Sequence, residues 1–162
     1  MLKEYTKTRN TVRALVFNDQ DQILLMQLRI PSDEVLKVDR VFWITLGGEI
    51  EENETPAETL FRELKEEGGI IEVRSFIPIG NSDQVLQWRS EPTRLMEQFF
   101  GVRVDEVNLE QVNLTEEEKL FLIEYQWWNI EDLAQTEEVF YPKNLIFLAR
   151  DYLENYSSKS GV

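Results

Sequence analysis

Residues 48–70, GEIEENETPAETLFRELKEEGGI, decide the fold of this chain, because they specify where a helix begins and which charged residues it carries. Thr55 followed three residues later by Glu58 is a capping box, in which each residue satisfies a free backbone N–H of the other. Pro56 occupies the first helical position, where the missing N–H of proline has no effect. The sequence therefore predicts a helix that begins at about Pro56.

The pattern that follows predicts how this helix packs and where it ends. Apolar residues recur at positions i, i+3, i+4 and i+7, which is one stripe facing a core, and they are Ala57, Leu60, Phe61 and Leu64. Gly68 and Gly69 supply the permissive backbone that ends helices. We expect the helix to end near Glu67.

Three carboxylates converge on this helix. Glu63, Glu66 and Glu67 fall within an arc of roughly 100°, because residues three and four apart share a face. Like charges this close repel and raise one another's pKa unless a cation neutralises them. Oxygen ligands suit Mg²⁺ or Mn²⁺, although three glutamates on an arbitrary surface helix are more often a solvated acidic face.

The surrounding pattern decides between these interpretations, because it resembles the signature of the Nudix hydrolase superfamily (MutT-like). That signature reads Gly, five residues, Glu, seven residues, Arg-Glu, an apolar residue, any residue, Glu-Glu, any residue, Gly and an apolar residue. The positions are filled by Gly48, Glu54, Arg62, Glu63, Leu64, Glu66, Glu67, Gly69 and Ile70. A chance match has a frequency below about one in ten million per starting position. The departures are mild, since Asn53 replaces a common glycine at a left-handed turn and Leu46 replaces a common proline.

The resemblance implies an α+β Nudix fold, an α/β/α sandwich with a mixed β-sheet between helices. It implies that Glu63 and Glu67 are the principal metal ligands, that Glu66 is a further ligand or the base that activates water, and that the carbonyl of Gly47 joins the metal. The implied cofactor is Mg²⁺ or Mn²⁺. Arg62 and Glu54 are expected to form an ion pair that ties the loop to the helix. The candidate catalytic residues are thus Glu54, Arg62, Glu63, Glu66 and Glu67.

Members of this family often add a glutamate from a loop beyond the signature. By chain position, that loop leads into Trp127 and Trp128, where Gln126 directly precedes the pair. Glu124 or the run at residues 116–118 must then serve instead. Thr115 with Glu118 is also the capping box of a short solvated helix.

Composition restricts the chemistry and the partners. The 162 residues contain no cysteine and no histidine, so carboxylates must do the chemistry, and relatives that act as isomerases through a cysteine are excluded. Seventeen basic against 31 acidic residues give a net charge of −14, which disfavours nucleic acid, an RNA cap or an anionic membrane as partner. With no signal peptide or membrane span, we expect a cytoplasmic protein, a monomer or homodimer.

One domain is expected over residues 1–162, with a disordered tail at 157–162. Apolar and β-branched runs predict strands at residues 11–17, 22–29, 41–46, 70–79, 94–104 and 124–130. The first two form a hairpin around the turn at 18–21, residues 30–40 form a polar loop, and so do residues 80–92 around Trp88. A helical turn is expected at 131–134 and a final helix at 143–156, its buried face made of Leu145, Leu148, Ala149 and Tyr152.

The expected function is hydrolysis of a phosphoanhydride (pyrophosphate) bond in a nucleoside diphosphate linked to another group, perhaps a nucleoside triphosphate. The candidate residues for binding this small-molecule nucleotide are Arg29, Trp43, Trp88 and Glu124. Tryptophan would stack on the base, although an aromatic in a sheet protein is more often core. Phosphate would be met by bridging metal ions and a few local arginines. The candidates are Arg13, Arg29, Arg40, Arg89 and Arg94, although each alone is more often a solvated surface residue. The alternative is a non-catalytic Nudix-like nucleotide-binding regulatory module, which would typically have lost some of these carboxylates.

Overall fold

The structure is a computed structural model that describes residues 4–32, 39–88 and 90–157. The strands are β1 (Lys7–Phe17), β2 (Gln22–Ile30), β3 (Arg40–Ile44), β4 (Leu46–Glu49), β5 (Ser75–Trp88), β6 (Glu91–Arg103), β7 (Leu122–Asn129) and β8 (Phe140–Tyr141). The helices are α1 (Pro56–Gly68), α2 (Glu116–Phe121), α3 (Ile130–Gln135) and α4 (Leu145–Asp151), with a 3₁₀ turn η1 (Leu109–Gln111) and a π-helical turn η2 (Tyr152–Tyr156).

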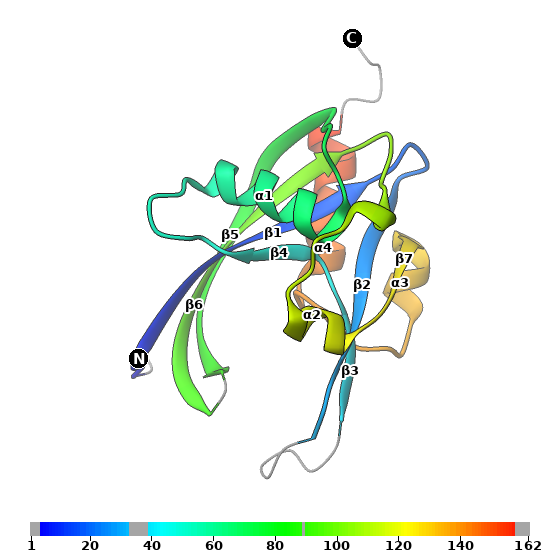
Figure 1. The fold of residues 1–162 in the computed structure, drawn as a ribbon. Coiled ribbons are helices and arrows are strands. Elements are labelled where there is room, and N and C mark those ends of the chain that lie inside the picture. Colours follow the sequence, from blue (N-terminus) through cyan, green and yellow to red (C-terminus); the bar gives the residue numbers. More distant parts are fainter. Residues whose placement is uncertain (1–3, 33–38, 89, 158–162) are drawn as a thin grey trace.

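The strands form one mixed sheet in the order β5-β6-β1-β2-β3-β8, with β4 paired to β1 and β7 paired to β2. Strand β1 runs parallel to β6, and β3 runs parallel to β8. Helix α1 lies on one face of the sheet and α4 on the other (Figure 1). This is the expected α+β fold, with a mixed sheet sandwiched between helices.

Two apolar cores follow from the alternation of side chains along β1. Leu15 and Phe17 pack with the residues of α3 and α4, whereas Val12, Ala14 and Val16 pack with those of α1. Alternate residues of a strand point to opposite faces, so a single strand supplies both cores. Each fully buried aliphatic side chain contributes about 1.5–3 kcal/mol. Strand β1 is thereby fixed from both sides.

The sheet divides beside β1, and this division positions the candidate site. Near its end, β1 pairs with β2 through Phe17 and Ile23, as the expected hairpin requires. Farther back, residues 11–14 of β1 pair instead with β4. Strand β4 therefore delivers the chain to the loop at 50–55 and to α1 at the point where β1 and β2 separate.

Helix α1 has the boundaries that its sequence predicts. The capping box of Thr55 and Glu58 is present, and the C-cap Gly69 has φ of 60°. Asn53 has φ of 66°, as expected for a left-handed position. The apolar stripe is right for the buried Leu60 and wrong for Phe61, which is 40% exposed and meets the ring of Phe76 edge-on at the border of the sheet.

The predicted loop at residues 80–92 is wrong, because β5 continues to Trp88 and β6 begins at Glu91. Polar residues of this stretch pair across a long antiparallel hairpin, for example Asn81 with Gln98. Strand β5 lies at the edge of the sheet, where one side of the strand meets solvent and polar residues are tolerated. Ser90, with φ of 66°, belongs to the tight turn.

Other boundaries shift for local reasons. Residues 70–74 precede β5 rather than form part of it, and Thr45 separates β3 from β4 within the expected strand at 41–46. The final helix is divided into α4 and η2, although its predicted face is buried. Strand β7, α3 and the capped helix α2 lie close to their predicted places. None of the helices in the described ranges has the length and apolar content needed to cross a membrane.

Candidate active site

Two glycines of β4 lie against two glutamates of α1. The amide of Gly47 donates a hydrogen bond to Oε1 of Glu67 at 2.7 Å. At Gly48, an added Cβ would lie 2.3 Å from Oε1 of Glu63, so that carboxyl group occupies the space that the glycine leaves. Gly47 has φ of 153°, and a Cβ there would lie 2.1 Å from the carbonyl oxygen of Val12. Backbone contacts restrict position 47 to glycine, whereas a side chain at position 48 would displace the carboxyl group of Glu63.

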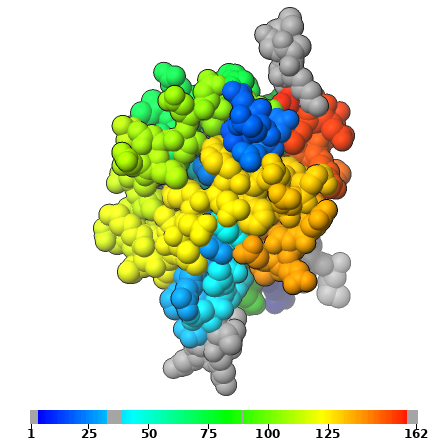
Figure 2. Space-filling model, turned by 90° about the vertical axis from the view of Figure 1, so that its right-hand side faces the viewer, coloured from blue at the N-terminus to red at the C-terminus, as the bar shows by residue number. Residues whose placement is uncertain are grey.

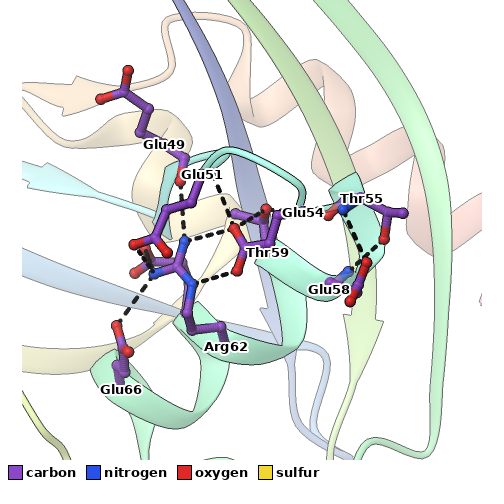
Figure 3. A network of polar contacts seen from close by, with 9 residues as sticks. Glu49, Glu51, Glu54, Thr55, Glu58, Thr59, Arg62 and Glu66 are labelled. Atoms are coloured by element: carbon purple, nitrogen blue, oxygen red, sulfur yellow. Dashed lines mark hydrogen bonds and ion pairs between the residues drawn. The ribbon is translucent and has the colours of Figure 1, made fainter.

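Arg62 organises the carboxylates at the start of α1 (Figure 3). It donates to both oxygens of Glu54, from Nε at 2.7 Å and from Nη2 at 3.0 Å. This two-pronged geometry is the ion pair expected from the sequence. The same guanidinium contacts Glu63 at 2.8 Å and Glu66 at 3.4 Å. Nη2 also donates to the carbonyl oxygen of Glu49, which joins the loop to the helix.

These contacts divide the carboxylates into two electrostatic classes. Hydrogen bonds from Arg62 and Thr59 lower the pKa of Glu54 to about 2, so Glu54 is an anchored anion. Burial raises the pKa of Glu63 to about 7, although Arg62 opposes the shift. Burial also raises the pKa of Glu67, which is 4% exposed. Groups of this kind are stabilised as anions only when a cation arrives.

The structure brings Glu118, one of the sequence candidates from outside the signature, next to Glu67. Its side chain hydrogen-bonds that of Glu67, and the bond raises the pKa of Glu67 further. Burial opposes ionisation of Glu118, but hydrogen bonds from Glu67 and Thr115 lower its pKa overall. The contact thus favours the neutral form of Glu67 and the ionised form of Glu118. Glu124, the other sequence candidate, is exposed on β7 opposite Gln27.

Helix α2 is held against the end of α1 by its flanking residues. The amide of Asn113 donates to the carbonyl oxygen of Glu66 at 2.7 Å, and the hydroxyl of Tyr125 donates to the carbonyl oxygen of Glu67. The capping box of Thr115 fixes the backbone of Glu118. Figure 2 shows the segment with α2 and β7, in yellow, spread across the middle of this face.

The donor set fits a divalent cation, but the described residues contain no three acidic side chains that already form a metal-binding group. The guanidinium of Arg62 donates hydrogen bonds to both Glu63 and Glu66. The carboxylates and the Gly47 carbonyl are hard oxygen donors of the kind that Mg²⁺ and Mn²⁺ prefer. A cation would take over the neutralising charge that Arg62 now supplies.

The sequence candidates for substrate binding lie in different places. Trp43 is 3% exposed, packs edge-on against Trp128 and donates from Nε1 to Glu138, so its position fits the core rather than stacking on a base. Arg29 forms an exposed ion pair with Asp39 near the end of β2. Trp88 lies at the end of β5, where the guanidinium carbon of Arg9 is 4.4 Å from its ring centroid. Arg89 lies outside the described residues.

Among the four candidate arginines that the structure describes, Arg13 reaches the signature. Arg13 of β1 pairs in register with Gly47, and its Nη1 donates to the carbonyl oxygen of Thr45 at 2.8 Å. Its charge acts on both Glu67 and Glu118. Arg13 could not be chosen from the sequence, because only the pairing of β1 with β4 brings it to this place.

Comparison with known families agrees with this geometry. Residues 7–149 match the family model of the NUDIX domain. No curated protein matches the chain by sequence.

Solved structures with the same fold are distant in sequence. The MutT protein from Methanosarcina mazei Go1 is 20% identical with a TM-score of 0.58, over 96% of this chain and 100% of that one. The E. coli dihydroneopterin triphosphate pyrophosphohydrolase is 17% identical with a TM-score of 0.63, over 93% and 99%. The NUDIX domain of Shewanella oneidensis NrtR, complexed with ADP ribose, is 19% identical with a TM-score of 0.62, over 92% and 90%. At these identities the likeness shows the fold alone.

Proposed function

Because the chain belongs to the NUDIX domain family, we propose that it is a divalent-metal-dependent hydrolase of a phosphoanhydride bond in a nucleoside diphosphate linked to another group. The observation that carries this proposal is the placement of Glu63 and Glu67 against Gly48 and Gly47. Both carboxyl groups have raised pKa values, and they lie against β4, where Glu67 is buried and Glu63 is half-buried. Such a pair is costly without a cation.

Each residue has a proposed role. Glu63, Glu66, Glu67 and the carbonyl of Gly47 would hold Mg²⁺ or Mn²⁺, which when bound lowers the pKa of water and stabilises charge on phosphate. Arg62 and Glu54 form the scaffold that joins the loop to α1. Glu118 is the candidate base, because it is half-buried beside Glu67 and its lowered pKa keeps it ionised at neutral pH.

A non-catalytic nucleotide-binding module is the competing function. It would need no cluster of repelling carboxylates, and the chain keeps every acidic residue of the signature. Retaining this cluster without a metal destabilises the fold. The cluster therefore favours the enzyme.

A phosphate-release screen in Mg²⁺ or Mn²⁺ would test this proposal and identify the substrate class. The panel comprises nucleoside triphosphates, ADP-ribose, NADH, dinucleoside polyphosphates, nucleotide sugars and dihydroneopterin triphosphate. ADP-ribose and dihydroneopterin triphosphate are included because two proteins with this fold bind or cleave them. We expect metal-dependent turnover of at least one compound that contains a diphosphate. Tight binding across the panel with no turnover in either metal would instead support the regulatory module.

A further inference from the structure

The guanidinium of Arg13 lies directly over the glycine that meets Glu67. Its Nε is 3.0 Å from the position that a Cβ on Gly47 would take, and the amide of the same Gly47 donates to Glu67. Arg13 and Glu67 therefore approach one residue of the signature from two elements, β1 and α1. The positive charge of Arg13 acts on this proposed metal ligand.

Arg13 has fewer acceptors than its five N–H donors can use. Nη1 donates to the carbonyl oxygen of Thr45, whereas Nε is buried without a hydrogen-bond partner. The ion pair from Nε to Oε2 of Glu97 is 3.6 Å long, and that oxygen already accepts from the hydroxyl of Thr11. A buried donor without a partner is energetically unfavourable. A bound anion would accept a hydrogen bond from this donor and remove the unfavourable term.

The other described candidate arginines contrast with Arg13. Arg94 donates to both oxygens of Asp83, and Arg29 is paired with Asp39 in solvent. Arg40 donates to the hydroxyl of Tyr141. Each of these side chains has its own exposed partner. Only 14% of the Arg13 side chain is exposed.

We propose that Arg13 binds the phosphoryl group next to the one held at the signature carboxylates, so that the site selects a diphosphate over a monophosphate. This inference rests on the proposed function. Two phosphoryl groups joined by one oxygen are neighbours, as are Arg13 and Glu67 about Gly47. Arginine donates two N–H bonds to a phosphate in a fixed geometry. The carbonyl of Thr45 and the carboxylate of Glu97 hold the guanidinium in position.

The test compares imidodiphosphate with orthophosphate, since neither carries a base. Calorimetry in Mg²⁺ would measure both affinities for the wild-type protein, Arg13→Met, Arg13→Lys and the control Arg94→Met. We expect the wild type to prefer imidodiphosphate. Arg13→Met should reduce that preference at least about tenfold, and Arg13→Lys should give an intermediate value, because lysine keeps the charge but loses the fork. Arg94→Met should behave as the wild type.

A purely structural arginine would change folding but not the ratio of the two affinities. An unchanged ratio in Arg13→Met would overturn the assignment, and so would a wild-type protein without the preference. If Arg13→Met does not fold, the test is made with Arg13→Lys. An unchanged ratio of the affinities for imidodiphosphate and orthophosphate in that variant would again contradict the assignment. A wild-type protein that shows the Arg13-dependent preference and hydrolyses nothing in the substrate screen would contradict the proposed function alone.

Discussion

Glu67 accepts a hydrogen bond from the amide of Gly47 at 2.7 Å, across 20 positions of sequence. The bond joins α1 to β4 inside the protein, where the side chain of Glu67 meets almost no solvent. The carboxyl group of Glu67 also contacts that of Glu118, which lies on a third element, α2. The residue that the sequence presents as one of three helical glutamates is thus the centre of the site.

Replacing Glu67 by glutamine should separate activity from stability. Glutamine can still accept from Gly47 and donate to Glu118, so the fold should be retained or slightly stabilised in metal-free buffer at about pH 8. We expect kcat to fall by at least about a hundredfold, because a charged ligand is lost. Steady-state kinetics and thermal melts check both. If the variant unfolded while its folded fraction kept full specific activity, Glu67 would be a structural residue rather than a catalytic ligand.

Arg62→Ala should act mainly on the fold. The ion pair of Arg62 with Glu54 is largely buried, and removing one partner leaves an uncompensated carboxylate, which costs about 3 kcal/mol. Arg74→Ala is the matched control, since Arg74 pairs with Asp19 and Asp105 at an exposed position, where solvent screens the ion pairs and their loss should have little effect on stability. Urea denaturation measures both. Equal losses in the two variants would mean that the Arg62 network has no special structural role.

Stability should depend on pH and metal together. The pKa of Glu63 is about 7 in the folded protein and 4.5 ordinarily, so the folded state binds the proton more tightly. That contribution is complete below pH 4.5 and is lost as the pH rises through about 7. Glu67 acts in the same direction. Without metal, we expect the melting temperature to be lower by about 5 °C at about pH 8 than at about pH 5.5.

Millimolar Mg²⁺ should reverse this loss, raising the melting temperature more at the higher pH, because binding to the ionised carboxylates stabilises the folded state. The chain has no histidine, so few other groups titrate in this range. Glu63→Gln should reduce both the pH effect and the Mg²⁺ effect. A melting temperature indifferent to Mg²⁺ at both pH values, in an active enzyme, would mean that the metal binds only with substrate.

Glu118→Gln should lower kcat by at least about tenfold if this residue accepts a proton during the reaction. Glu116→Gln is the control, because Glu116 lies on the same helix, is exposed and is paired only with Lys119 among the contacts described for it. The pH–rate profile on the acidic side should change in the first variant and not in the second. Identical profiles would remove Glu118 from the reaction.

The sequence predicts what depends on local chemistry. The capping box of Thr55 follows from spacing along the chain, and the left-handed Asn53 and the ion pair of Arg62 with Glu54 follow from the resemblance to the signature. Prediction from sequence fails where contacts with distant parts of the chain determine the local structure. Residues 80–88 are polar enough to read as a loop, yet pairing with β6 makes them a strand.

The same limit applies to the candidate site. Arg13 and Glu118 come to Glu67 through sheet pairing and through the docking of α2, neither of which leaves a local signal. Trp43 shows the opposite outcome, in which the tertiary fold removes a sequence candidate from the site. Its burial depends on the packing of α3 and α4 beneath the sheet. The signature identifies the centre of the site, and the tertiary fold selects its surroundings.

The most direct test of the central claim measures turnover of the best substrate with the metal removed and restored. ³¹P NMR would follow cleavage of the phosphoanhydride by wild-type protein and by Glu67→Gln, first in excess EDTA and then in excess Mg²⁺ or Mn²⁺. We predict no cleavage in EDTA, full recovery with metal in the wild type, and at least about a hundredfold slower cleavage in the variant. Full turnover by the wild-type protein in excess EDTA would contradict the account.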